Sequence, residues 1–169
     1  MTSFSLRSLK LRSGEAYREE RDVELEPLVL GGERYLPVPG TVAAELAVTR
    51  ASTGTVFELQ FRARLHGPCY RCAGDAIVDE SISAREYQAA SADASEELRS
   101  PYVVDEVLDL SGWARDALVL ALPEKILCRT DCAGLCPVCG ADLKAEPHDH
   151  GPAEPDPRWG ALAGLRDRL

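Results

Sequence analysis

Alternation of apolar and polar residues begins at about Thr41 and continues through three successive segments. In TVAAELAVTR the apolar residues recur at every second position, namely Val42, Ala44, Leu46 and Val48. The segment TVFELQFRARL repeats the pattern after the turn ASTG, and DAIVDESISAREYQ extends it after PCYRCAG. Because successive side chains of a strand point to opposite faces of a sheet, this period predicts three strands. Their short connections predict an antiparallel meander.

The apolar positions of the second and third segments identify candidate core residues. In the second segment one side consists of Phe57, Leu59, Phe61, Ala63 and Leu65. In the third segment the apolar members include Ile77, Ile82 and Tyr87.

The first forty residues have no clear period. FSLRSLKL is interpreted as a short strand. ELEPLVLGGERYLPVPG holds three prolines and three glycines, which favour turns and a loop.

One helix is expected at about residues 109–122, after an exposed loop over residues 90–104. Asp109 or Ser111 can cap its start, and Pro123 marks its end. The helical spacing places on one face Leu110, Trp113, Ala114, Ala117, Leu118 and Ala121. Val119 and Leu120 broaden this apolar face. Trp113 is interpreted as a core anchor, with ligand stacking as the alternative.

These elements predict an α+β fold, in which an antiparallel β meander or partly closed sheet carries one main helix and is followed by a zinc-knuckle segment. The predicted division is a β-rich domain with its helix at 1–122, a cysteine-rich zinc-binding segment at 123–150 and a tail at 151–169. The tail is polar and rich in proline before it ends in RWGALAGLRDRL. Trp159, Leu162, Leu165 and Leu169 there predict a short helix, which either docks back or binds a partner groove through Trp159.

The chain is acidic, with a formal net charge of −9 over 169 residues. Carboxylates cluster in EAYREERDVELE, DASEEL and VVDEVLD. These clusters are either solvated surfaces or a docking surface for a basic partner. Direct binding to naked RNA is disfavoured, because it normally requires a basic patch. No apolar run is long enough to cross a bilayer or to form a signal peptide, so we expect a cytoplasmic protein that does not bind membranes.

Six cysteines carry the strongest candidate chemistry, because a cytoplasmic location keeps thiols reduced and favours metal binding. Cys136-Pro-Val-Cys139-Gly140 has the form of a zinc knuckle, and a second CxxC pair, Cys69 and Cys72, lies on a predicted turn. Two arrangements remain open. One has two Zn²⁺ sites, the first formed by Cys69, Cys72, Cys128 and Cys132 and the second by Cys136, Cys139, His148 and His150. The other has one site formed by Cys128, Cys132, Cys136 and Cys139, with both histidines solvated.

Catalytic interpretations find little support in the sequence. A thioredoxin-like CxxC begins a helix after a strand, whereas Cys69 and Cys72 lie between two predicted strands. A zinc deaminase requires His-x-Glu upstream of its Pro-Cys-x-x-Cys, but His66 is followed by Gly67 and Pro68. We therefore predict a protein that is not an enzyme, with no catalytic residues and no small-molecule substrate. A zinc-based or thiol-based redox-responsive regulator is the alternative.

A wider set of motifs resembles the YceD family of large-subunit ribosomal RNA accumulation proteins. The matching residues are Cys69 and Cys72, Asp109-Leu110, Leu120 to Pro123, Cys128, Cys132, Gly134 to Gly140, and Asp156 to Leu162. The additional cysteines and His148-Asp149-His150 are similar to the actinobacterial branch, and other branches carry CxC at the histidine position. The resemblance implies a role in ribosome biogenesis, in the accumulation or maturation of 23S rRNA, without a catalytic activity. It also implies a large-subunit ribosomal protein, or an rRNA–protein assembly intermediate, as the partner.

Overall fold

The computed structural model describes residues 1–91 and 93–151. The chain divides into two compact units, the first being Met1–Cys132 and the second beginning at Ala133. The helix predicted around Trp159, with both interpretations of its docking, lies outside the described residues. The expected division at residues 122 and 150 stays a prediction.

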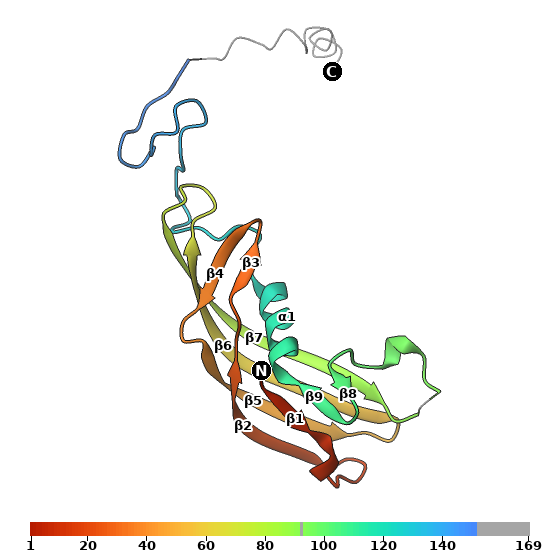
Figure 1. Cartoon of the computed structure of the whole chain (residues 1–169). Helices are drawn as coiled ribbons and strands as arrows, with labels where there is room; N and C mark the ends of the chain where they lie inside the picture. Colours follow the sequence, from red (N-terminus) through yellow and green to blue (C-terminus); the bar gives the residue numbers. More distant parts are fainter. Residues whose placement is uncertain (92, 152–169) are drawn as a thin grey trace, which may run out of the picture. The chain divides into compact units, whose positions relative to one another are not determined.

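The first unit is built on the predicted meander, and its fold is of the α+β type, mostly antiparallel sheet with one α-helix (Figure 1). Strand β6 (Gly54–Pro68) pairs antiparallel with β5 (Thr41–Arg50) and, over its whole length, with β7 (Asp75–Ala89). Three further strands complete this sheet: β2 (Ala16–Glu24) pairs with β5, β4 (Glu33–Pro37) pairs with the end of β6, and β3 (Leu28–Leu30) pairs with β4.

The alternation that predicted the meander also sets its buried face. The residues predicted for the inner side of β5 and β6 are buried, and Phe57 and Leu59 are fully covered. In β7 the alternation separates the apolar residues, so that Ile82 is buried whereas Ile77 is 56% exposed. Burying apolar area on one face of the sheet is the main stabilising contribution to this unit.

The N-terminal region departs from the prediction of turns and a loop. It holds β2, and β3 and β4 form a hairpin whose turn residues Gly31 and Gly32 both have positive φ. Such a two-residue turn requires glycine or asparagine, and its twist matches that of the flanking strands. Gly31 and Gly32 therefore form the tight turn of a hairpin between two strands and are not part of an irregular loop.

The hairpin holds the end of β6 that leads to Cys69. Tyr35 of β4 is buried, and its hydroxyl donates a hydrogen bond of 2.9 Å to the carbonyl oxygen of Pro68. Its ring covers Gly67, where an added Cβ would lie 2.3 Å from a ring carbon. Only glycine fits this position while Tyr35 keeps its place.

A second sheet of three short strands joins the N-terminus to the helix. Strand β9 (Val107–Asp109) lies between β1 (Ser3–Ser5) and β8 (Val103–Val104). The predicted strand FSLRSLKL is thus shorter, because a 3₁₀ turn follows at Leu6–Ser8. The predicted loop over 90–104 contains another 3₁₀ turn, Glu96–Leu98, before β8. Asp105 and Glu106 form the β8–β9 turn with φ of 50° and 62°.

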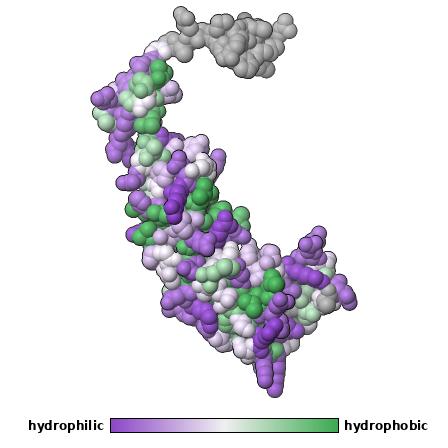
Figure 2. Space-filling view, in the orientation of Figure 1, coloured by the Kyte–Doolittle hydropathy of each residue, from purple (hydrophilic) through white to green (hydrophobic). Residues whose placement is uncertain are grey.

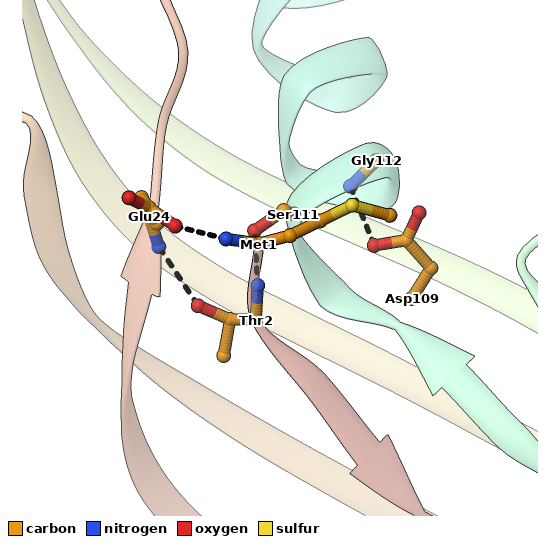
Figure 3. A network of polar contacts seen from close by, with 6 residues as sticks. All are labelled: Met1, Thr2, Glu24, Asp109, Ser111 and Gly112. Carbon is orange, nitrogen blue, oxygen red and sulfur yellow. Dashed lines mark hydrogen bonds and ion pairs between the residues drawn. The ribbon is translucent and has the colours of Figure 1, made fainter.

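Helix α1 (Leu110–Ala121) has the predicted start and end. Asp109 is the N-cap, and its carboxylate accepts a 3.0 Å hydrogen bond from the Gly112 N–H. The other candidate cap, Ser111, instead accepts a hydrogen bond from the Thr2 N–H at 2.7 Å. Figure 3 shows this network, in which Thr2 also accepts from the Glu24 N–H and the Met1 ammonium pairs with Glu24. The first strand is thereby tied to the first turn of the helix.

The helix packs through most of the predicted core positions, but Ala121, predicted on the same face, is exposed, and Leu120 needs a second correction. Trp113 is 2% exposed, which confirms its role as a core anchor, and Leu110, Ala114 and Leu118 are buried as well. Leu120 does not broaden the buried face: it is 88% exposed, and it lies on the opposite side of the helix from buried Leu118.

The face of the molecule in Figure 2 is largely hydrophilic, with separate hydrophobic patches among the described residues. No helix in residues 1–91 and 93–151 is long and apolar enough to cross a membrane.

Candidate metal centres

The first cysteine cluster lies where the β6–β7 turn meets the segment that follows α1. Cys69 and Cys72 belong to the turn, and Cys128 and Cys132 to the segment. Their four sulfur atoms all lie within 4.8 Å of one another. Cys69 and Cys132 are buried and belong to the hydrophobic core, whereas Cys128 is exposed. The cluster therefore joins two segments that are distant in sequence.

Backbone and side-chain contacts hold the two segments together beside the sulfurs. The Tyr70 N–H donates to the carbonyl oxygen of buried Ile126 at 2.8 Å, and Arg71 donates to the carbonyl oxygen of Cys132 at 2.7 Å. The Lys125 ammonium lies 5.2 Å from the centre of the Tyr70 ring. The positions of the four thiols are therefore fixed by groups other than the thiols themselves.

The sulfur separations fit a tetrahedral metal ion. A Zn²⁺ ion with four Zn–S bonds of about 2.3 Å requires sulfur atoms about 3.8 Å apart. The Cys69–Cys132 pair is separated by 3.9 Å and the Cys72–Cys128 pair by 3.8 Å. A disulfide would bring two sulfur atoms to about 2 Å. The four thiols are thus spaced as ligands of one ion and remain unbonded to one another.

The protonation of this cluster is uneven. Burial alone would raise the pKa of Cys69, but hydrogen bonds from the backbone N–H groups of Cys128, Cys72 and Arg71 outweigh it and lower that pKa to about 6. Burial and the neighbouring thiols raise the pKa of Cys128 to about 12. A thiolate at one cysteine thus disfavours deprotonation of its neighbours, because the negative charges repel one another. A divalent cation among the sulfurs would remove this repulsion.

The second cluster lies wholly within the second unit. Its ligand atoms, from Cys136, Cys139, His148 and His150, also lie within 4.8 Å of one another. The Cys139 sulfur is 3.2 Å from Nε2 of His148, compared with about 3.6 Å expected for a thiolate and an imidazole on one tetrahedral Zn²⁺. Cys136 is buried, whereas Cys139 and His150 are exposed.

The orientation of His148 fits metal binding through Nε2. Its Nδ1 lies 2.7 Å from the carbonyl oxygen of Glu146. Since a carbonyl oxygen can only accept a hydrogen bond, Nδ1 carries the proton and the Nε2 lone pair faces Cys139. Metal-binding histidines commonly have such a partner on the other ring nitrogen. Glu146 raises the pKa of His148, and the Cys136 thiol raises it further.

A small hairpin presents these ligands. Leu135 and Asp142 form a β-bridge, and the Leu143 N–H donates to the carbonyl oxygen of Gly134 at 3.1 Å. The Asp142 carboxylate then accepts from the Lys144 N–H at 2.9 Å, which begins the turn toward His148. Few apolar side chains are available here, so local hydrogen bonds position the ligands.

The two CxxC loops have the same backbone hydrogen bonds. The Cys69 N–H donates to Gly74, and the Cys136 N–H donates to Ala141, each five residues later. In return, the N–H groups of Ala73 and Gly140 donate to the carbonyl oxygens of Cys69 and Cys136. The N–H groups inside each loop lower the pKa of its first cysteine, which is about 6 for Cys136 as for Cys69. Both loops therefore stabilise thiolate by the same means, as zinc knuckles do.

The eight residues predicted as ligands thus fall into the two groups of the two-site arrangement. The structure does not gather the four cysteines of the one-site arrangement into a single cluster within the described residues. Sequence reasoning missed Arg71 and the carbonyl of Glu146, which orient the ligands. Neither residue type nor spacing marks these two groups, since one is a surface arginine and the other is main chain.

Comparisons with known proteins identify a family whose description names ribosomal RNA. The family described as large ribosomal RNA subunit accumulation protein YceD matches residues 57–166, which is more than half of the chain. The match includes all eight candidate ligands.

Curated relatives come from mycobacteria and a plant. The uncharacterized protein Rv2926c of Mycobacterium tuberculosis is 36% identical over 125 residues, which is 72% of this chain and 60% of that protein. The large ribosomal RNA subunit accumulation protein YCED homolog 1, chloroplastic, of Arabidopsis thaliana is 34% identical over 77 residues, 46% of this chain and 24% of that protein. The chain spans about 60% of the length of the mycobacterial relatives. No solved structure matches it. On the extent of the family match, the chain belongs to the YceD family.

Proposed function

We propose that this chain is a non-enzymatic, cytoplasmic accessory factor of ribosome biogenesis that supports the accumulation or maturation of 23S rRNA. In this proposal it holds two structural Zn²⁺ ions. Cys69, Cys72, Cys128 and Cys132 bind the first, and Cys136, Cys139, His148 and His150 bind the second. Membership of a family named for accumulation of large-subunit rRNA supports the ribosomal role.

The observation that carries the zinc part is the repetition of one loop. Two CxxC turns, far apart in the sequence, have the same hydrogen bonds and the same lowered pKa of the first cysteine. Each is completed by a second pair of ligands, so that the four ligand atoms of each cluster lie within 4.8 Å of one another, and in the first cluster the Cys72–Cys128 separation of 3.8 Å suits tetrahedral Zn²⁺. A closed set of four protein ligands leaves no position for a substrate, which favours a structural role for the ions.

The partner in this proposal is a large-subunit ribosomal protein or an rRNA–protein assembly intermediate. A chain with a net charge of −9 repels naked phosphate backbones and attracts basic proteins.

Zinc content tests the metal sites directly. Protein purified under reducing, chelator-free conditions is expected to hold two equivalents of zinc. Cys69→Ser and Cys136→Ser are each expected to lose one equivalent, and His148→Ala is expected to lose the same equivalent as Cys136→Ser. A double variant of Cys69 and Cys136 then retains none. Metal-free wild-type protein, or loss of both ions on one single substitution, contradicts the two-site proposal.

The ribosomal role is tested by removing the chain from its host. We expect a lower ratio of 23S to 16S rRNA, and restoration by the wild-type gene. Association with assembly intermediates is expected to survive nuclease treatment, since the partner surface is protein. Unchanged rRNA levels after depletion overturn the role.

A second candidate function, a zinc-based or thiol-based redox-responsive regulator, is favoured by one feature. Cys139 of the second cluster is exposed and next to Cys136, whose thiol has a pKa lowered to about 6. A lowered pKa favours the thiolate of Cys136, the form that oxidants attack, and the nearby thiol of Cys139 is a partner for a disulfide. Release of zinc by mild peroxide, together with a change in partner binding, identifies the redox-responsive function. Retention of zinc under the same conditions supports the structural role.

A further inference from the structure

The outer edge of β7 has no pairing strand among the described residues. β7 extends over Asp75–Ala89 and pairs only with β6, so alternate N–H and C=O groups along its other edge point away from the sheet. Long free edges invite pairing with another chain, and proteins usually shorten, bend or cover them.

A groove runs along this free edge. Its volume is about 500 Å³, and six consecutive residues of β7, Ser81–Glu86, line it. Successive side chains of a strand point to opposite faces of the sheet, so a groove on one face would be lined by every second residue. Lining by six consecutive residues therefore indicates that the groove follows the edge, where main-chain groups are accessible.

The opposite wall of the groove belongs to α1 and to Tyr102, which precedes β8, and it is mostly apolar. It consists of Tyr102, Trp113, Ala117, Leu120 and Ala121. Leu120 is 88% exposed and continues the apolar wall made with Trp113 and Ala117, and contiguous exposed apolar surface is typical of binding grooves. An extended segment in the groove would bury Leu120 on one side and bond to the β7 main chain on the other.

The charges near the groove select a basic occupant. Arg85 is the basic side chain on the strand wall, and Glu58 of β6 already pairs with it. Glu86 lines the groove, and the Asp116 carboxylate, which also pairs with Arg115, accepts a hydrogen bond from the Tyr102 hydroxyl on the other wall. With a net charge of −9 over the chain, the local field attracts cations.

We propose that the groove between β7 and α1 binds an extended basic segment of a partner protein, which adds as a strand to β7 at Ser81–Glu86. Main-chain hydrogen bonds supply affinity, and alternate apolar side chains of the partner contact Leu120 and Ala117. This proposal rests on the proposed function for the expectation of a ribosomal protein partner, and it adds where such a partner docks.

The test uses a short synthetic peptide of alternating lysine and valine, together with the same peptide carrying glutamate in place of lysine. Zinc-loaded full chain is titrated with each, and amide hydrogen exchange is measured by NMR. We expect the lysine peptide to bind and to slow exchange at alternate amides of Ser81–Glu86. The glutamate peptide is expected to bind at least 10-fold more weakly.

Three variants separate the contributions of apolar contact and of charge to the binding of the peptide. Leu120→Gln removes apolar contact at an exposed position and is expected to weaken binding 5-fold to 10-fold without loss of zinc. Glu86→Lys is expected to weaken the lysine peptide and to strengthen the glutamate peptide. Ile77→Glu is the matched control, because Ile77 is exposed on the same strand outside the groove, and it should leave the affinity within 2-fold.

Several results overturn the proposal. These are binding without protection of β7 amides, protection by an RNA oligonucleotide in preference to the peptide, and concentration-dependent protection without any peptide, which would mark pairing between two copies. Normal rRNA accumulation with a Leu120→Gln chain that has lost peptide binding overturns the docking site and leaves the proposed function intact. Normal rRNA accumulation after depletion of the chain overturns the function, whatever the peptide does.

Discussion

The two cysteine clusters use the same loop in different surroundings. The first contributes Cys69 and Cys132 to the core of a sheet that already has many buried apolar residues. The second lies in a hairpin in which most residues are exposed and local hydrogen bonds position the ligands. We infer that a metal would fasten existing structure in the first unit and would be the main source of folding free energy in the second.

Removal of the metal is expected to have the largest effect, and it should affect the folding of the two units differently. Excess chelator should unfold residues 133–151, because binding of structural Zn²⁺ contributes about 10–16 kcal/mol in small zinc-binding peptides. The sheet should persist, since apolar burial holds it. Limited proteolysis with and without chelator measures this, and equal resistance of residues 133–151 in both conditions would falsify the inference.

Substitution of a single ligand should change the free energy of unfolding differently in the two units. Cys132→Ser is expected to lower the free energy of unfolding of the first unit by about 3 kcal/mol, because it removes a buried ligand and leaves a hydroxyl among sulfurs. Cys139→Ser should change that free energy by less than about 0.5 kcal/mol, as an exposed residue of the other unit. Denaturant titration followed by far-UV circular dichroism checks both, and equal effects would contradict the comparison.

The residue after each CxxC gives a smaller, paired test. Gly140 has a φ of 74° and Ala73 a φ of 56°, so the two loops share a conformation that only glycine adopts without strain. Gly140→Ala should cost about 1 kcal/mol, although no atom lies within 4 Å of the added Cβ. Ala73→Gly should stabilise the first cluster by about 0.5 kcal/mol. Competition with a chromophoric chelator measures both changes as shifts in metal affinity, and changes of the same sign would count against the shared conformation.

The smallest expected effect concerns Lys125. Replacing it with glutamine removes the cation from the Tyr70 ring and should destabilise the first unit by about 0.5 kcal/mol. The second unit should keep its metal affinity. A change in that affinity would show that the two clusters are coupled.

The sequence predicted the centre of the sheet because burial there is large and regular. Along most of β5 and β6 every second residue is buried, and these buried positions hold apolar residues. The helix was predictable for the same reason, with its cap at Asp109 and its end before Pro123. Leu120 was wrongly predicted to be buried. The helix has apolar residues on several sides, and its sequence alone does not show which side packs against the sheet.

β2 could not be found from its sequence because its inner face is charged. Glu19 and Arg21 point inward, where they pair with each other, Tyr17 donates to Glu19 at 2.8 Å, and Arg21 lies 5.1 Å from the Phe4 ring centre. In a sequence, a glutamate and an arginine at alternate positions indicate an exposed polar face, and only the structure shows that these two side chains pair with each other. The acidic run EAYREERDVELE is therefore partly a strand.

The ligand set was predictable from spacing, whereas its division was not. Pairing of Cys69 with Cys132 depends on how the chain returns after α1, which the contacts of Tyr70 and Arg71 determine. The zinc itself stays a prediction.

The difference in donor atoms gives each site its own spectroscopic signature. Four cysteine sulfurs form one candidate site, and two cysteine sulfurs with two imidazoles form the other. Cobalt(II), which adopts tetrahedral geometry as zinc does, has colours that depend on the number of sulfur ligands. Filling this chain with cobalt would therefore reveal, by absorbance alone, which site loads first and which releases its ion first.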